Sequence, residues 1–201
     1  MRKLITLLII FGLLFVACLK NPFTTRDSQN PAGSSGTWET PATPEVVLLN
    51  LMFAVTENNI QNYQLCLADD YRFSATQDSI EAEGQGNGYL YRFWDKATEV
   101  SAMQNLFTSF AAENKYIDVI FSPSSDYPDD LGDSLSVLYR DYIIRIIDVD
   151  TVAADTSFIQ GQAEFSISRS MFNWWSIYLW SEVPISGTND NWADLKAEYR
   201  N

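Results

Sequence analysis

Residues 158–183, FIQGQAEFSISRSMFNWWSIYLWSEV, decide the fold class of this 201-residue chain. The run is rich in Ile, Phe, Tyr and Trp, which favour β-strands. In its first half, apolar side chains alternate with polar ones, which predicts a strand with one buried and one wet face. The apolar members are Ile159, Ala163, Phe165 and Ile167. In its second half both faces are bulky, and the run as a whole predicts two antiparallel strands.

Further elements precede this run. Residues 115–121 and 134–148 have the same strand-forming composition. Upstream, the Thr-Pro-Glu sequence at residues 43–45 predicts a helix start with a hydroxyl cap, and a second short helix follows over residues 60–67. Asp95 is predicted to cap a third and longest helix. Helices followed by a long antiparallel sheet are the element order of an α+β domain.

The first 18 residues, MRKLITLLIIFGLLFVAC, have the pattern of a secretory signal peptide. Arg2 and Lys3 precede a 14-residue apolar run that ends at a cysteine. This run is shorter than the roughly 20 residues that a membrane-spanning helix needs. The pattern predicts that residues 1–17 are removed as a signal peptide.

The end of this segment, Phe-Val-Ala-Cys at residues 15–18, resembles the lipobox of bacterial lipoproteins, although Phe15 stands where that pattern prefers leucine. The resemblance implies a diacylglyceryl thioether on Cys18 and usually an acylated amino group. Two or three acyl chains hold a protein essentially permanently on a membrane. Because Leu19 and not aspartate follows the cysteine, the resemblance implies a bacterial cell envelope location, at the outer membrane in two-membrane bacteria.

Residues 18–43 are predicted to form a lipidated cysteine followed by a disordered tether. Pro, Gly, Ser and Thr supply 14 of the 24 positions from 21 to 44, a composition that cannot bury enough apolar surface to fold. Within it, Trp38 is read as an exposed linker aromatic; the alternatives are an anchor folded back on the domain and insertion at the membrane interface. Residues 44–201 are predicted to form one domain.

The charge balance restricts possible partners and chemistry. The chain has 26 acidic and 13 basic residues and no histidine; without Arg2 and Lys3 the 11 remaining bases leave a net charge of −15. Phosphate binding requires a basic face, so the balance argues against a nucleic-acid partner. The absence of histidine excludes Ser-His-Asp and Cys-His relays and His-ligated zinc. We expect no cofactor.

Two further features have structural interpretations. The acidic residues of the run 126–133 could hold calcium, but their spacing fits no calcium-loop pattern, and a solvated hairpin loop is the preferred reading. No metal site is therefore expected. Cys66 lies in a helical pattern beside Leu65 and Leu67, and without a histidine to activate it we interpret it as a buried apolar residue.

The order of elements resembles the nuclear transport factor 2-like superfamily, the cone-shaped fold shared with ketosteroid isomerase, scytalone dehydratase and polyketide cyclases. The resemblance covers residues 44–201 and rests on NIQNYQLCLADDYRF (59–73), FWDKATEV (93–100), WWSIYLWSEVP (174–184) and NWADLK (191–196). It implies N-terminal helices packed on a curved antiparallel sheet. The interior of such a cone is either a ligand pocket or core.

Two functions from different classes follow, with a third that is purely structural. The preferred one is a non-enzymatic binding module of unknown ligand, with Trp174, Tyr178 and Trp180 forming an apolar interface for a homodimer or an envelope protein. The alternative is a small-molecule isomerase or hydratase with Asp118 as base and Tyr63 or Tyr142 as donor, although alternation alone places Asp118 outward. The third is a spacer with a filled cone.

Overall fold

The computed structural model describes residues 36–149, 155–183 and 190–200, and these described residues belong to one compact unit. The predicted signal peptide, Cys18 and the predicted tether as far as residue 35 lie outside the described residues. Within the described ranges, no helix is both long and apolar enough to cross a membrane.

Three helices and a closing helical turn expected over residues 192–196 correspond to predicted elements, and two further elements are new. The helices are α2 (Pro44–Thr56), α3 (Ile60–Cys66), α4 (Thr76–Gly84), the 3₁₀ helix η1 (Gly88–Tyr91), α5 (Lys96–Ala112) and α6 (Trp192–Glu198). Asp95 caps α5 as predicted, because its Oδ1 accepts the Thr98 N–H at 2.9 Å. The predicted hydroxyl cap of α2 is wrong: Thr43 makes no side-chain cap bond, although Pro44 opens the helix.

The strands form one sheet, in the order β1-β6-β5-β4-β2. They are β1 (Leu67–Ser74), β2 (Lys115–Pro123), β3 (Asp130–Leu131), β4 (Leu135–Asp148), β5 (Asp155–Arg169) and β6 (Trp175–Val183), with β3 paired to β4. The expectation of a purely antiparallel sheet needs one correction, since β1 runs parallel to β6. The chain between β1 and β2 forms α4, η1 and α5, so β1 is not held in a hairpin and can lie at the far edge.

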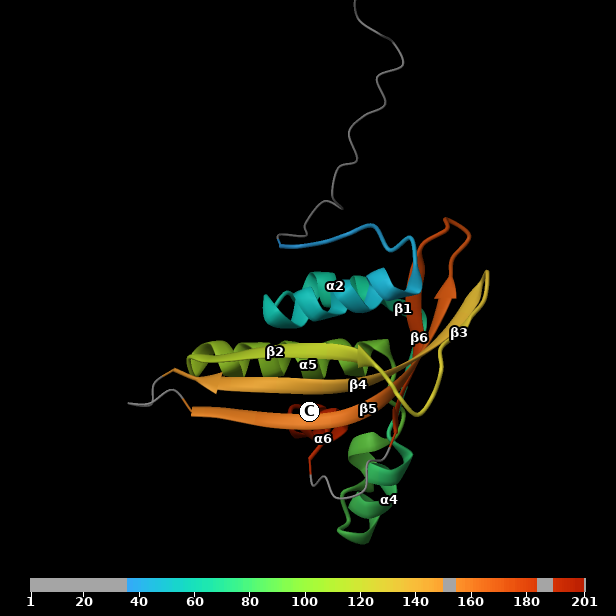
Figure 1. Ribbon diagram of the computed structural model, residues 1–201. Coiled ribbons are helices and arrows are strands. Elements are labelled where there is room, and N and C mark those ends of the chain that lie inside the picture. The colour runs from blue at the N-terminus through green and yellow to red at the C-terminus, as the bar shows by residue number, and fades with distance from the viewer. Residues whose placement is uncertain (1–35, 150–154, 184–189, 201) are drawn as a thin grey trace, which may run out of the picture. The chain divides into compact units, whose positions relative to one another are not determined.

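The core lies between the sheet and the helices. α2, α3 and α5 contact the sheet, as does α6 through β5, and Figure 1 shows α5 lying behind β2 and β4. The alternation in β5 is confirmed only in part: Ala163, Phe165 and Ile167 are fully buried, but Gln162 and Ser166, on the face predicted to be wet, are buried as well. The α+β fold predicted from the element order is therefore the observed architecture.

The folded unit begins before the predicted boundary at residue 44. The Glu39 N–H donates to Asn50 Oδ1 at 2.8 Å, and Asn50 Nδ2 donates back to the Glu39 carbonyl at 2.7 Å. Trp38 is partly buried against the core, so it folds back onto the domain and is not an exposed linker aromatic. Two residues after Glu39, the Pro41 carbonyl accepts the Trp175 N–H at 3.0 Å, which ties the chain before α2 to the start of β6.

Candidate functional site

A buried ion pair lies at the centre of the domain. Lys196, on α6, places its Nζ 3.1 and 3.2 Å from the two carboxylate oxygens of Glu99 on α5, and both side chains are 0% exposed. The Tyr63 hydroxyl donates to Glu99 Oε1 at 2.6 Å. Burial lowers the pKa of Lys196, while Glu99 acts against that shift. One side of the ammonium is thus neutralised by a hydrogen-bonded carboxylate.

Aromatic rings surround the rest of this ammonium. Lys196 Nζ lies 3.4 Å from the centroid of Phe73, 4.0 Å from that of Trp180 and 5.8 Å from that of Trp94. The faces of aromatic rings attract cations, most strongly where water is excluded. The Lys196 ammonium is therefore enclosed by aromatic rings and by the Glu99 carboxylate.

A second buried carboxylate lies nearby, on β6. Glu182 accepts the Tyr142 hydroxyl at 2.7 Å and the Trp180 indole N–H at 3.0 Å. Burial raises the pKa of Glu182 to about 7, although Lys196 and the Tyr142 hydrogen bond act against the rise. The Tyr142 hydroxyl in turn accepts the Trp192 backbone N–H at 2.9 Å. The Glu182 carboxylate and the Tyr142 hydroxyl thus have internal partners, whereas the buried indole N–H of Trp192 has none.

Helix α6 brings both Trp192 and Lys196 into the interior, because residues four apart lie on the same helix face. Polar contacts hold the N-terminal end of α6 to neighbouring elements: Asn191 Nδ2 donates to Asp78 at 2.6 Å, and the Tyr91 hydroxyl donates to Asp194 at 2.7 Å. Arg200 donates to the carbonyls of Leu90 and Arg92 at 2.6 and 2.8 Å. The C-terminal segment is thus fastened across α4 and η1, with its inner face in the core.

Comparison of the sequence with protein-family models and with curated proteins finds no match. Comparison of the structure does find matches. A nuclear transport factor 2-like protein with a cystatin-like fold from Novosphingobium aromaticivorans superposes with a TM-score of 0.50 at 6% identity, over 71% of this chain and 80% of its own. The fold is the nuclear transport factor 2-like cone.

Two other solved structures share this cone at the same level. A putative aromatic ring hydroxylase from Novosphingobium aromaticivorans has a TM-score of 0.50 at 14% identity, over 80% of this chain and 96% of its own. A protein of unknown function from Mycobacterium tuberculosis has a TM-score of 0.50 at 7% identity, over 77% and 82% of the two chains. At these identities the likeness defines the cone fold alone.

The sequence-predicted catalytic residues do not come together in the cone. Asp118 alternates along β2 with the buried Ile117 and Val119, so it lies on the outer face of the sheet. There it pairs with Arg145, its cross-strand neighbour on β4, whose Nε lies 2.9 Å from Asp118 Oδ1. Asp118 therefore cannot serve as the base in the cone interior. Tyr63 and Tyr142 do lie in the interior, but each binds its own glutamate.

The predicted aromatic interface is also corrected. Trp180 is 0% exposed, inside the cone, whereas Trp174 is 53% exposed and lies in the turn before β6. Tyr178 is half-buried. The register of β6 shifts against β5 at Ser166 and Ile167, and this irregularity breaks simple alternation in the strand. The three residues therefore do not form one outward patch.

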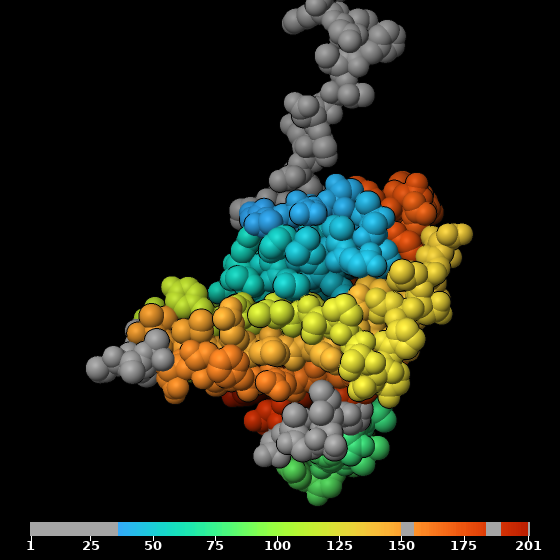
Figure 2. Space-filling view, in the orientation of Figure 1, coloured from blue at the N-terminus to red at the C-terminus, as the bar shows by residue number. Residues whose placement is uncertain are grey.

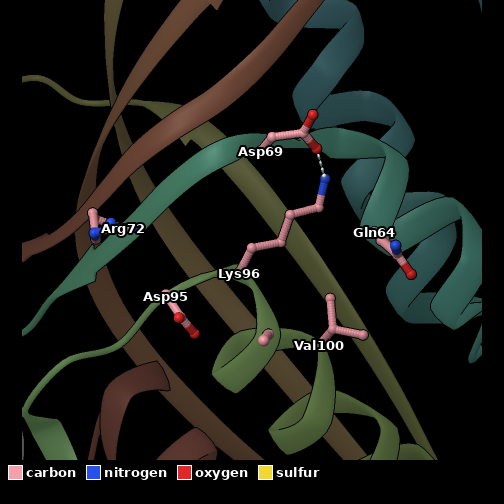
Figure 3. A pocket seen from close by; sticks show the side chains of 7 residues that line it. Gln64, Asp69, Arg72, Asp95, Lys96 and Val100 are labelled. Carbon is pink, nitrogen blue, oxygen red and sulfur yellow. Dashed lines mark hydrogen bonds and ion pairs between the residues drawn. The ribbon is translucent and has the colours of Figure 1, made fainter.

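A surface cleft of about 540 Å³ lies between α3, β1 and the start of α5 (Figure 3). Its charged side chains are already engaged. Lys96 Nζ binds Asp69 at 3.0 Å and the Leu67 carbonyl at 2.8 Å, while Asp95 caps α5. The cleft is therefore a poor candidate for a reactive centre.

The acidic loop between β2 and β4 has a structural role. Asp129 forms a two-pronged ion pair with Arg140, with N···O distances of 2.6 and 2.9 Å, and also accepts the Tyr139 N–H. Among the residues that the structure describes, no group of three or more acidic or cysteine side chains is placed to hold a metal ion. Cys66 is buried, and burial raises the pKa of its thiol.

The sequence patterns did not identify three buried charged residues of this site: Glu99, Glu182 and Lys196. A signal for Glu99 was present, because it falls on the same helical stripe as the buried Met103 and Leu106. A carboxylate in an apolar stripe indicates a buried partner. No comparable signal linked it to Lys196, which lies 97 residues further along the chain.

Proposed function

We propose that this chain is a lipid-anchored lipoprotein of the bacterial cell envelope and that its folded domain is a non-enzymatic interaction module. The observation that carries the non-enzymatic part is the occupation of the cone centre by the protein's own side chains. Lys196 and Trp192 enter from α6, and the buried carboxylates they meet are satisfied by internal partners. A substrate would have to displace these contacts before it could reach Glu99 or Glu182.

The binding surface in this proposal is the outer face of the sheet. We define the outer sheet patch as the exposed apolar residues Tyr116, Ile120, Ile143 and Phe158, whose exposed fractions run from 39% to 60%. The strand register makes them neighbours, because Ile120 lies opposite Ile143, and Arg145 lies opposite both Asp118 and Phe158. Figure 2 shows β2, β4 and β5 uncovered by helices on the near side. Contiguous exposed apolar residues mark interaction surfaces.

The partner that this patch fits is a second copy of the chain. The protein carries a formal net charge of −13, so two copies repel each other over most approaches. The outer sheet patch is locally neutral, because the Asp118–Arg145 ion pair lies among its apolar residues. In a two-fold dimer the outer sheet patch packs against the same patch of the second copy. Asp118 of one copy can then lie near Arg145 of the other, and the reverse contact follows by symmetry.

We expect the chain from residue 19 onward to dimerise at micromolar concentration and Ile120→Glu to abolish this. Burial of an unpaired carboxylate in the interface costs about 3 kcal/mol, equivalent to roughly a hundredfold weaker association. Sedimentation velocity over a concentration series measures the effect. Ile80→Glu is the matched control, because Ile80 is 62% exposed on α4, away from the patch. A monomeric wild type, or an Ile120→Glu protein that dimerises normally, would contradict the dimer.

The anchoring proposal has its own test. In a bacterial host the full chain should lose residues 1–17 and gain the mass of a lipidated cysteine, and Cys18→Ser should lose both changes. Intact mass spectrometry of the membrane fraction reads out processing and lipid together. Cys66→Ser is the control, because Cys66 is buried in α3 and should not alter the modification. Equal masses for Cys18→Ser and wild type, after allowance for the substitution, would refute lipidation.

The Glu182–Tyr142 pair favours a second candidate, a small-molecule isomerase or hydratase. A carboxyl group with a pKa of about 7 beside a tyrosine hydroxyl is suited to proton transfer at neutral pH. This candidate keeps the carboxylate and tyrosine chemistry but replaces Asp118 with Glu182. It requires α6 to leave the cone, because Trp192 donates its backbone N–H to the Tyr142 hydroxyl.

A further inference from the structure

The turn that joins β5 to β6 exposes a cluster of large apolar side chains. We call residues 170–174, Ser-Met-Phe-Asn-Trp, the hairpin tip. Met171 is 89% exposed, Phe172 76% and Trp174 53%. Three large apolar side chains in five consecutive residues thus face solvent. Such a cluster marks an interaction site, whereas a single exposed apolar residue does not.

The backbone of the hairpin tip has a defined conformation. The Ser170 N–H donates to the Trp174 carbonyl at 2.8 Å, and the Asn173 N–H donates to the Ser170 carbonyl at 2.9 Å. Asn173 has φ +64°, a left-handed conformation that asparagine tolerates better than most residues. The turn is closed by its own hydrogen bonds, so it presents its apolar side chains from a fixed base.

The charge around the hairpin tip differs from that of the rest of the chain. No acidic residue occurs between Glu164 and Glu182, and the only charged residue in that interval is Arg169. The whole chain, in contrast, has twice as many acidic as basic residues. The hairpin tip therefore carries no carboxylate of its own, although the Arg169 N–H donates to the Ser134 carbonyl at 2.9 Å and so brings the exposed Asp133 near the base of the hairpin.

The hairpin tip lies beside the end of the segment that precedes α2. The Trp175 N–H donates to the Pro41 carbonyl, whereas the Thr37 N–H donates to Glu57 at the far end of α2, and Figure 1 shows this blue segment running along α2 and ending beside the β5–β6 turn. Residues 37–41 are held on the domain, so the predicted tether runs over the 18 residues from Cys18 to residue 36. A flexible chain of that length reaches roughly 23 Å, so an anchor at Cys18 keeps the domain, and with it the hairpin tip, near the bilayer surface.

We propose that the hairpin tip is a membrane-contact element, in which Met171, Phe172 and Trp174 enter the headgroup boundary of the bilayer that holds Cys18. This inference rests on the proposed anchoring. Tryptophan favours the membrane interface, where its apolar ring and its indole N–H are both accommodated. One apolar turn binds a bilayer weakly alone, but a short tether raises its effective concentration into the millimolar range. The contact would orient the domain on the membrane.

Coupling to synthetic vesicles tests the proposal without biological lipidation. The chain from Cys18 onward is joined through the Cys18 thiol to maleimide-phosphatidylethanolamine in phosphatidylcholine vesicles. Cys66 should not react, because it is 1% exposed. Brominated phosphatidylcholine then quenches any tryptophan that enters the bilayer. We expect quenching in the wild type and its loss in Met171→Ser/Phe172→Ser, which keeps Trp174 as reporter, and in Trp174→Phe, which removes the reporter.

The matched control is Tyr116→Ser/Phe158→Ser, which removes two aromatic residues of similar exposure from the outer sheet patch and should leave the quenching unchanged. Near-UV circular dichroism verifies that each variant is folded. Absence of quenching in the wild type overturns the proposal, as does quenching that survives in Met171→Ser/Phe172→Ser or Trp174→Phe. Loss of dimerisation in Met171→Ser/Phe172→Ser, without wild-type quenching, would assign the tip to a second copy instead. Because the coupling is chemical, these results are independent of whether cells lipidate Cys18.

Discussion

Lys196→Ala should lower the free energy of unfolding by about 3–5 kcal/mol, because it leaves the Glu99 carboxylate buried without its countercharge. It also removes the cation from the rings of Phe73 and Trp180. Urea unfolding at 25 °C, followed by tryptophan fluorescence, measures the loss. Breaking any other ion pair of the described residues should have a smaller effect, since those pairs are at least partly exposed and contribute little.

Two controls separate the buried charge from other effects. Lys196→Met/Glu99→Gln removes both charges at nearly constant volume, and it should recover most of the lost stability, because a neutral pair replaces the buried ion pair. Lys115→Ala breaks the surface pair with Glu113 and should leave the unfolding midpoint unchanged. A loss below about 1 kcal/mol for Lys196→Ala would contradict this prediction. A double variant no more stable than the single one would show that the unpaired Glu99 charge is not the cause of the loss.

Trp180→Ala should destabilise the protein by about 3–5 kcal/mol, the range for removing a large aromatic side chain from a core. Trp180 is fully buried, with ring centroids 4.7 Å from Phe165 and 4.8 Å from Trp192. Its indole N–H is also one of the two side-chain donors that Glu182 accepts. The expected effect is thus on folding, whereas the sequence pattern had assigned Trp180 to an interface.

Trp174→Ala is the matched control, since it makes the same substitution six residues away at an exposed position. Its unfolding midpoint in urea should equal that of the wild type, while that of Trp180→Ala falls clearly below it. Equal midpoints for the two variants would contradict the placement of Trp180 inside the cone.

Local patterns were sufficient for much of the fold. The alternation in residues 158–169 depends only on the two-residue period of a strand, and the Asp95 cap depends on a hydrogen bond three residues away. The order of helices and strands, and hence the α+β cone, follows from such short-range signals. Helix α4 was missed because none of its residues is buried, so it has no apolar stripe to reveal it.

The candidate site was much less predictable, because its residues come from distant parts of the chain. Tyr63 and Tyr142 were identified as interior candidates, yet their carboxylate partners were not. Glu99 meets Lys196 across 97 residues, and Tyr142 meets Glu182 across 40. Strand order and register decide such encounters, and neither leaves a mark on the local sequence.

The sequence by itself determined the order of the main helices and strands, the acidic character of the chain and the absence of any histidine-based chemistry, since these depend on composition and short periods. Only the tertiary structure decided which faces are covered. Alternation defines two faces of a strand but does not say which one a helix will bury. The placement of Trp180 inside and Asp118 outside, and the filling of the cone by α6, therefore depended on contacts between segments far apart in the chain.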